Sequence, residues 1–137
     1  MAYIRPQMSA PIRLLIADDS DIVRRAICRV LEDASAITVI GEARNYTELL
    51  RIFRESTPQV VLMDLRMPDD TQFHADTIKA QLGDSCLLAM SAFADEETAS
   101  LARRYGALKL LDKAGLGSTL IPAIEECTRE KGKVQNA

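Results

Sequence analysis

The sequence predicts an α/β protein in which helices cover both faces of a parallel five-stranded sheet. Three observations lead to this fold class. Short apolar runs that suit buried strands alternate with segments of helical period five times along the 137 residues. The most apolar run, Val60–Met63, shows no alternation, which is typical of a strand buried on both faces. Four of the five runs end in a polar or charged residue, as expected at the carboxyl edge of a parallel sheet.

The strands begin at residue 12 and are separated by one helix each. The expected strands are Ile12–Ala17, Ile37–Ala43, Val60–Asp64, Cys86–Ser91 and Leu108–Asp112. Thr38 and Glu42 alternate with apolar residues in the second strand, which therefore suits an edge of the sheet.

Each helix is predicted from its capping residues and its apolar positions. Ser20 can cap the first helix, Asn45 and Glu48 have capping-box spacing before the second, and Ser118 can cap the last. The positions expected to face the core are Ile22, Val23, Ala26, Ile27, Val30 and Leu31 in the first helix, Tyr46, Leu49, Leu50 and Phe53 in the second, Ala75, Ile78 and Leu82 in the third, and Leu120, Ala123, Ile124 and Cys127 in the last.

The fourth helix, opened by Asp95 and ended by Gly106, has the weakest apolar face, which consists of Ala99, Ala102 and Tyr105. We therefore expect its docking to be the least stable in the chain. In the last helix, Pro122 is expected in or just beyond the first turn, where a missing N–H costs least.

Charge and hydropathy point to one domain without nucleic-acid or membrane contacts. The chain has 17 Lys and Arg against 20 Asp and Glu, a net charge of −3. No apolar run approaches the roughly 18 residues of a membrane span, and residues 1–11 lack the apolar core of a signal peptide. We expect an N-terminal tail at 1–11, a domain at 12–128, a C-terminal tail at 129–137, and a cytoplasmic protein with no direct nucleic-acid binding.

The three cysteines, Cys28, Cys86 and Cys127, are odd in number and far apart in the sequence. Each lies in an apolar pattern. We interpret them as small hydrophobic core residues in a reducing compartment.

Polar side chains with matching chemistry follow four strands. Asp18 and Asp19 close the first strand, Asp64 the third, Ser91 the fourth and Lys113 the fifth. In a sheet ordered 2-1-3-4-5 the first and third strands are neighbours, so the three carboxylates would converge. Converging carboxylates need a compensating charge, and Mg²⁺ suits a site with few protein ligands. Each of these residues alone has a structural interpretation as a turn, capping or surface residue.

Together these groups match the needs of phosphoryl transfer, which depends on a positioned nucleophile and neutralised phosphoryl oxygens. Asp64 would be the nucleophile, as carboxylates are in aspartyl-phosphate enzymes.

Four segments carry a resemblance to a known family: Ile16–Ser20, Val60–Pro68, Ala89–Ala92 and Leu110–Lys113. They occur in order, each at the end of an expected strand. Over residues 12–128 the chain resembles the response-regulator receiver domain of two-component signalling. The resemblance implies a doubly wound, flavodoxin-like fold with five helices and strand order 2-1-3-4-5.

The resemblance also implies roles for individual residues. Asp64 would be the phosphoacceptor, and Ser91 and Lys113 would grip the phosphoryl group. Asp19 and Asp64 would ligate Mg²⁺ directly, Asp18 would do so through water, and the Arg66 backbone carbonyl would complete the protein ligands. The donor would be a phosphohistidine on a sensor histidine kinase or phosphotransfer protein. The chain would assist its own phosphorylation and dephosphorylation without being an enzyme for another substrate.

The sequence departs from the family pattern in three places. The loop 69–73 lacks the glycine that often follows Met-Pro, which leaves its shape open. Ala114 replaces a proline that is often cis, and we expect a trans bond there, because a cis bond before a non-proline residue costs roughly 2.5–4 kcal/mol. Leu110 replaces an aromatic residue that swings inward on phosphorylation, so another residue must report the switch.

Output is expected at the face made by the fourth helix, the fifth strand and the last helix. Candidate residues on it are Phe93, Arg103, Lys109 and Leu110. A downstream protein partner or a phosphorylation-dependent homodimer would use this face. Phe93 would serve as a hydrophobic gate or as part of a docking patch. Arg66 would either shield the phosphoryl group from water or point outward.

Three alternatives remain open. Haloacid dehalogenase-like hydrolases also form aspartyl phosphates, but they generally carry a second Asp two residues after the nucleophile, where this chain has Arg66. A pseudo-receiver would keep the fold as a binding module without phosphorylation. The chain could also be the receiver part of a longer DNA-binding response regulator, cut before its output domain.

Overall fold

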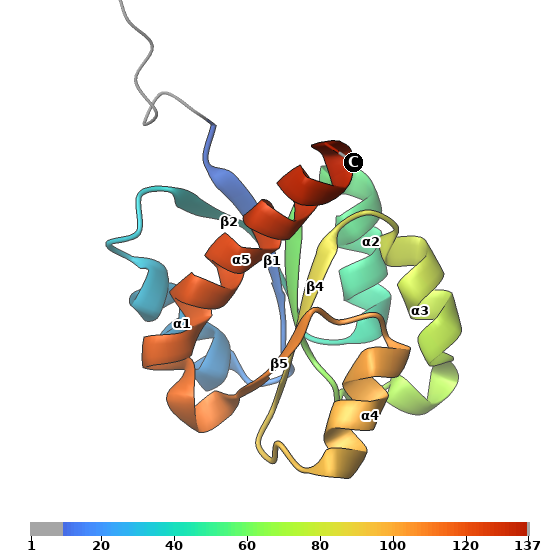
Figure 1. Ribbon diagram of the computed structural model, residues 1–137. Helices are drawn as coiled ribbons and strands as arrows, with labels where there is room; N and C mark the ends of the chain where they lie inside the picture. The colour runs from blue at the N-terminus through green and yellow to red at the C-terminus, as the bar shows by residue number, and fades with distance from the viewer. Residues whose placement is uncertain (1–9, 137) are drawn as a thin grey trace, which may run out of the picture.

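The fold is described by a computed structural model that covers residues 10–136, with side chains described through Arg129. Its parallel sheet has the order β2-β1-β3-β4-β5, which confirms the predicted fold class (Figure 1). The strands are β1 (Ile12–Ala17), β2 (Ile37–Ala43), β3 (Val60–Asp64), β4 (Cys86–Ser91) and β5 (Lys109–Asp112). The helices are α1 (Asp21–Leu31), α2 (Tyr46–Ser56), α3 (Ala75–Leu82), α4 (Glu96–Arg104) and α5 (Leu116–Asn136). Residues 1–9 of the expected N-terminal tail lie outside the described residues.

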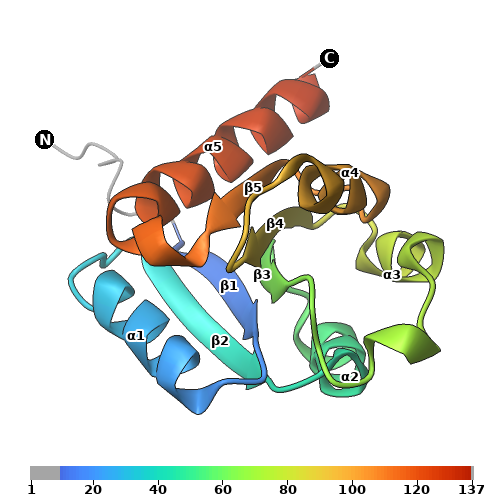
Figure 2. The ribbon, with the colours of Figure 1, turned by 90° about the horizontal axis from the view of Figure 1, so that it is seen from below.

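Two layers of helices enclose the sheet. Figure 2 shows α1 and α5 on one face and α2, α3 and α4 on the other. Side chains of β1 alternate between the two cores, with Leu14 and Ile16 toward α1 and α5, and Leu15 and Ala17 toward the other three helices. Every residue of β3 is buried, as its unbroken apolar run predicts.

The strand order places a switch point beside β1 and β3. These neighbours pair in parallel from Leu14–Val60 to Ala17–Met63, so they end at the same edge of the sheet. The chain leaving β1 enters α1 on one face, and the chain leaving β3 goes on to α3 on the other. The two loops therefore separate and leave room between them for a site.

The first helix, α1, buries fewer of its apolar side chains than its sequence suggests. Ile27 and Leu31 are buried and Val23 is half-buried, as predicted. Ile22 is 76% exposed and Ala26 is also exposed, so their assignment to the core is wrong. The stripe in contact with the sheet is narrower than the apolar arc of the sequence, and these two positions fall at its edge.

The start of the last helix differs from the prediction. A 3-10 helix, Lys113–Gly115, follows β5 directly, and the side chain of Asp112 caps it by accepting from the Ala114 N–H at 2.8 Å. Ser118 is not a cap, because it lies inside the first turn of α5 and its hydroxyl donates to the Gly115 carbonyl. Pro122 consequently lies deeper in the helix than expected.

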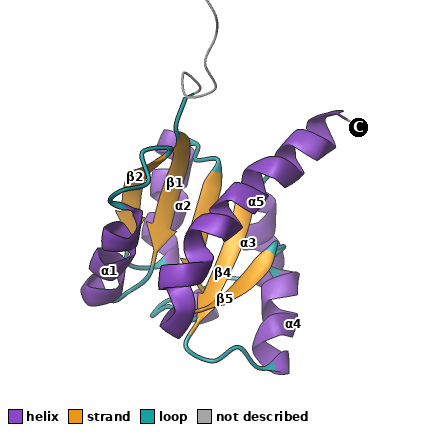
Figure 3. Cartoon of the chain, turned by 60° about the vertical axis from the view of Figure 1, so that its left-hand side comes forward, coloured by secondary structure: helices purple, strands orange, loops and turns teal. Residues whose placement is uncertain are grey.

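The last helix is also longer than its apolar pattern. It continues to Asn136, so residues 129–136, expected as a polar tail, are helical in their backbone. Figure 3 shows α5 extending beyond the sheet.

The cysteine prediction is wrong for two of the three residues. Cys86 at the start of β4 and Cys127 in α5 form a disulfide, with their Cα atoms 5.7 Å apart and a sequence separation of 41. The crossover from β4 through α4 and β5 lays α5 back over the sheet and brings the two together, which spacing along the chain does not reveal. Cys28 is a free, half-buried thiol whose pKa is raised by burial.

Within residues 10–136, no helix is both long and apolar enough to cross a membrane.

Candidate functional site

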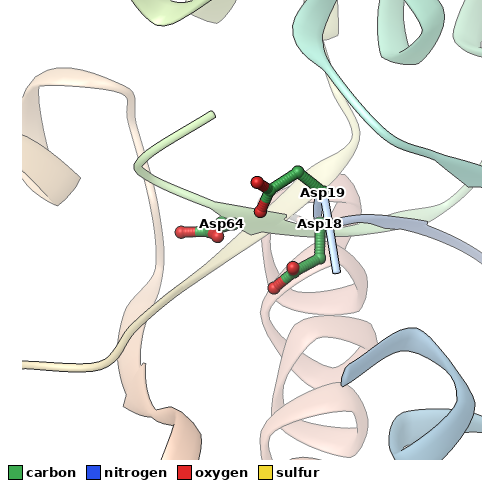
Figure 4. Close-up of side chains that lie close together, drawn as sticks. All are labelled: Asp18, Asp19 and Asp64. Carbon is green, nitrogen blue, oxygen red and sulfur yellow. The ribbon is translucent and has the colours of Figure 1, made fainter. Parts of the chain in front are cut away.

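Three carboxylates meet where β1 and β3 end. Asp18 and Asp19 follow β1 and Asp64 ends β3, as Figure 4 shows. Each offers an oxygen, and these oxygens all lie within 4.8 Å of one another. Asp18 and Asp64 are buried, whereas Asp19 is exposed. The predicted convergence is confirmed, and one member of the cluster opens to solvent.

A single ammonium group contacts both buried acids. Nζ of Lys113 donates a hydrogen bond to Oδ2 of Asp64 at 2.8 Å and lies 2.7 Å from Oδ2 of Asp18. The second contact lacks hydrogen-bond geometry, so Oδ2 of Asp18 is buried with an ionic contact alone. An under-satisfied buried carboxylate oxygen is costly unless another positive group approaches it.

Burial and charge act against each other on these groups. Burial raises the pKa of Asp64 and outweighs the lowering effects of Lys113 and the Arg66 N–H, which donates to Oδ1 at 3.0 Å. Burial also works to lower the pKa of Lys113, but its contacts with Asp18 and Asp64 prevail and raise it. Lys113 is therefore a cation held among acids at neutral pH.

Asp18 is held through both its side chain and its backbone carbonyl. Its Oδ1 accepts from the Ser20 N–H at 2.8 Å, and its carbonyl accepts from Nη1 of Arg24 at 2.6 Å. Arg24 is buried, and its charge is already paired with Asp21 and with Glu42 of β2. The guanidinium can therefore hold the loop after β1 without leaving an unpaired cation beside the acidic cluster.

A cavity of about 360 Å³ opens beside Asp64. Its lining consists of Asp64, Arg66, Ser91, Ala92, Phe93, Asp95, Thr98 and Lys113. Ser91 is buried and its Oγ accepts from the Phe93 N–H at 3.2 Å. Phe93 is 75% exposed at the rim. The cavity gives a small ligand access to the carboxylate, the ammonium and the hydroxyl together.

The loop after β3 keeps its shape without glycine. Among the described residues, positive φ occurs only at Thr57, Gly83 and Gly106, so none is needed in the loop 69–73. Asp69 ties the loop to α2 by accepting from the N–H groups of Tyr46 at 2.9 Å and Thr47 at 3.0 Å. The bond before Ala114 is trans, as predicted.

A family model described as the response regulator receiver domain matches residues 14–125. The chain belongs to this family. This membership agrees with the four sequence segments, all of which lie within or at the ends of the strands that build the receiver site.

The chain is similar to parts of two longer regulatory proteins. The chain is 31% identical over 126 residues to the transcriptional regulatory protein LiaR of Bacillus subtilis, covering 91% of this chain and 60% of LiaR. It is 47% identical over 57 residues to the response regulator GacA of Pseudomonas viridiflava, covering 42% of this chain and 27% of GacA. The chain thus spans less than two thirds of these relatives.

Solved structures agree with the fold. The signal receiver domain of NarL from Mycobacterium tuberculosis superimposes with a TM-score of 0.79 at 24% identity, covering 88% of this chain and 98% of that one. RcsB of Salmonella typhimurium gives a TM-score of 0.81 at 21% identity, covering 89% of this chain and 62% of that one.

The acidic cluster of this receiver domain can hold a metal ion. Its donors are carboxylate oxygens, which hard cations prefer. Oδ2 of Asp18, buried and under-satisfied, is an oxygen that a cation would complete. The residues present therefore fit a hard divalent cation.

Three residues around the receiver site were not identified from the sequence. The sequence predicts Tyr46 only as a core residue of α2 and assigns no role to Arg24 or Thr98. All three are buried, and each has a partner at the site or its edge. The Asp95–Thr98 spacing, in which Asp95 accepts from the Thr98 N–H, is the one signal that could have found Thr98.

Of the residues expected at the output face, Arg103 lies on α4, Lys109 and Leu110 lie on β5, and Phe93 lies in the loop before α4. Arg103 pairs with Glu96 at 3.2 Å within α4, and Lys109 of β5 pairs with Glu126 of α5 at 2.9 Å. Leu110 is half-buried against the core beneath α4.

Proposed function

We propose that this receiver domain accepts a phosphoryl group on Asp64 from a phosphohistidine. The observation that carries the proposal is the set of groups around Asp64, which joins a carboxylate at a cavity, an ammonium 2.8 Å away and a hydroxyl on the same wall. An oxygen of Asp64 attacks phosphorus, the P–N bond breaks and the imidazole leaves. Lys113 and Ser91 then contact the phosphoryl oxygens and stabilise their charge.

Mg²⁺ fits the acidic cluster and, when bound, neutralises charge on the phosphoryl oxygens. Asp19 and Asp64 would bind it directly, Asp18 through water, and the Arg66 carbonyl would be the remaining protein ligand. Asp19, the exposed acid, supplies the side of the cluster that a hydrated ion can reach. Burial of Asp18 and its hydrogen bond from Ser20 keep that side chain in place before the ion arrives.

The test is labelling with a small phosphodonor plus Mg²⁺, followed by intact-mass and peptide mass spectrometry. One phosphoryl group should be found on Asp64, and the Asp64→Asn variant should gain none. Asp112→Asn is the matched control, because Asp112 is exposed at the end of β5 and an asparagine can still cap the following 3-10 helix. Full labelling of Asp64→Asn would refute the assignment.

The partners follow from this chemistry. The donor is a sensor histidine kinase or phosphotransfer protein, in the cytoplasm, and the output is a contact with a downstream protein or a second copy of the chain through α4, β5 and α5. Phosphorylation adds roughly two negative charges beside Lys113 and Ser91. Ser91 is the last residue of β4 before the loop into α4, and Lys113 directly follows β5, so a displacement of either side chain reaches this face.

Hydrogen exchange with and without a phosphoryl mimic tests the output face. Changes in protection are expected between Ser91 and Ile121, around Phe93, Arg103, Lys109 and Leu110. Changes confined to α1 and α2 would show that the output face lies elsewhere.

A second candidate is the receiver part of a longer DNA-binding response regulator. It is favoured by the coverage of LiaR, of which this chain spans 60%. Whether the reading frame continues past Ala137 into a DNA-binding domain decides between this candidate and a receiver that acts alone.

A further inference from the structure

A buried tyrosine contacts the backbone of the proposed phosphoacceptor. Tyr46, at the start of α2, is 0% exposed, and its hydroxyl donates toward the carbonyls of Asp64 and Leu65, each at 3.2 Å. Burial raises the pKa of Tyr46, so the hydroxyl keeps its proton at physiological pH. The peptide that leaves Asp64 is therefore held from the α2 side of the sheet.

A second tyrosine extends this contact to the far end of α4. Tyr105 caps the C-terminal end of α4 and is 5% exposed. Its hydroxyl oxygen lies 3.4 Å from that of Tyr46, and the two rings stack with centroids 6.1 Å apart. Because carbonyls only accept, Tyr46 donates to the backbone of Asp64–Leu65 and Tyr105 donates to the Tyr46 oxygen.

The helix α4 is thus joined to the site at both ends. At its N-terminal end, Asp95 and Thr98 line the cavity beside Asp64. At its C-terminal end, Tyr105 is connected through Tyr46 to the carbonyl of Asp64 itself. Figure 2 shows α2 and α4 on the same face of the sheet, with α3 beside them. A helix held at both ends can respond to a change at the site by moving as a unit.

The face of β5 toward α4 offers no comparable polar connection. Leu110, half-buried in the same core, has no hydrogen-bonding group on its side chain. The tyrosine pair is therefore the polar side-chain route that the described contacts provide from the backbone of Asp64 to the end of α4.

We propose that Tyr46 is a positioning residue that fixes the Asp64–Leu65 backbone and, through its hydrogen bond to Tyr105, couples phosphorylation of Asp64 to the position of α4. This inference rests on the proposed function, because it requires that Asp64 be the residue that is modified. A shift of the Asp64–Leu65 backbone changes its hydrogen bond to Tyr46. In the low-dielectric interior a broken hydrogen bond is costly, so the Tyr46 and Tyr105 side chains are expected to shift with the backbone.

Two variants remove one hydroxyl each and keep the rings: Tyr46→Phe and Tyr105→Phe. Phe73→Leu is the control, since Phe73 packs edge-on against Tyr46, with centroids 5.9 Å apart, and its side chain has no hydrogen-bonding group. Each protein is labelled with the small phosphodonor and Mg²⁺, the phosphoryl group is counted by mass spectrometry, and hydrogen exchange of residues 96–105 is measured with and without the label.

The wild type and Phe73→Leu should show a change in α4 exchange on phosphorylation. Tyr46→Phe and Tyr105→Phe, compared with the wild type at equal extents of labelling, should lose at least two thirds of that change. The double variant should lose no more than either single variant, because the hydroxyls act as one connection.

Three results would overturn the inference. One is an α4 response in both Phe variants equal to that of the wild type. Another is an equal loss in Phe73→Leu, which would assign the effect to packing. The third is a wild type that labels at Asp64 without any α4 response. Failure of the wild type to label at all is a different outcome, since it refutes the proposed function and the inference with it.

Discussion

Nζ of Lys113 lies 2.8 Å from Oδ2 of Asp64, and this contact reaches across the end of β4 to join β5 with β3. The same ammonium contacts Asp18 at the end of β1. One side chain therefore gathers the carboxyl ends of the central strands. The ammonium group lies beside the same carboxylates that a bound cation would contact. The two positive charges would therefore repel each other.

Replacing Lys113 with Met should strengthen divalent-cation binding. The substitution removes the positive charge but keeps the length and much of the volume of the side chain. The negative charges of the carboxylates are then no longer balanced by the ammonium group. We expect Mg²⁺ to bind at least about fivefold more tightly, given the repulsion between cations a few ångströms apart. The dependence of the melting temperature on Mg²⁺ concentration measures this affinity. Lys109→Met, an exposed change in β5 just before Lys113, should leave it unaltered, and weaker binding by Lys113→Met would contradict the prediction.

Replacing Asp64 with Asn should stabilise the metal-free fold at neutral pH. Burial raises the pKa of Asp64 above its unfolded value. The stability contributed by such a carboxyl group is fully present below about pH 3.9 and is lost as the pH rises through the folded pKa. An amide does not suffer this loss, so the gain of the variant should be largest at pH 7 and shrink toward pH 4.

Urea unfolding with a chelator at both pH values measures this gain. Asp84→Asn, in an exposed turn, should show no comparable trend. A gain for Asp64→Asn that is equal at both pH values would argue against burial as the cause.

Removing the Arg66 side chain should shorten the life of the phosphorylated form. Arg66 lines the cavity beside Asp64, and its guanidinium has the reach and fork to lie over phosphoryl oxygens and hinder water. We expect Arg66→Ala to lose phosphate roughly threefold faster, about 0.7 kcal/mol in the barrier. The rate is followed by phosphate release after the donor is removed. Arg103→Ala, which lines only the neighbouring groove of α4, is the control, and equal rates in all three proteins would count against shielding.

Replacing Cys127 with Ser should destabilise the oxidised protein. The disulfide joins residues with a sequence separation of 41, and its loss should lower the free energy of unfolding by about 2–5 kcal/mol. The wild type should lose a similar amount on adding dithiothreitol, whereas Cys127→Ser should be insensitive to it. Cys28→Ser, which leaves the disulfide in place, should respond to the reductant as the wild type does. A wild type unaffected by reductant would contradict the prediction.

A methyl group at Gly41 should be poorly tolerated. Gly41 follows an irregularity in the pairing of β2 with β1, and a Cβ there would lie 2.9 Å from Ile52 and 3.1 Å from Leu15. We expect Gly41→Ala to cost about 1–3 kcal/mol in the free energy of unfolding. Gly117→Ala in α5 has open space and should be neutral or more stable by up to about 1 kcal/mol. The two urea curves give the comparison, and equal stabilities would exclude the steric explanation.

The sequence was sufficient for the fold and for the chemistry at the strand ends. The apolar run before Asp64 determines a buried strand, and parallel strands bring their carboxyl ends to one edge, so Asp18, Asp19 and Lys113 follow from local patterns and topology alone. The same holds for the caps at Ser20 and Asn45, because a cap depends on residues within one turn.

The missed features depend on contacts between distant segments. Cys86 meets Cys127 only because α5 crosses back over β4, and Tyr46 meets Tyr105 only because α2 and α4 share a face of the sheet. Ser118 has the composition of a cap, but Asp112 starts the helical turn earlier and so decides where α5 begins. Local capping preference cannot decide which of two nearby capping residues, Asp112 or Ser118, begins the helical segment.

The Cys86–Cys127 disulfide closes a covalent ring. This ring contains the part of the receiver whose position we expect to change on phosphorylation. Ser91, α4, β5 and Lys113 all lie between the two cysteines, and the ring closes at the end of β4 opposite Ser91. A protease that cuts the backbone anywhere from Leu87 to Glu126 would leave both fragments attached to each other until a reductant is added. The segment can thus be opened at one point without being lost from the molecule.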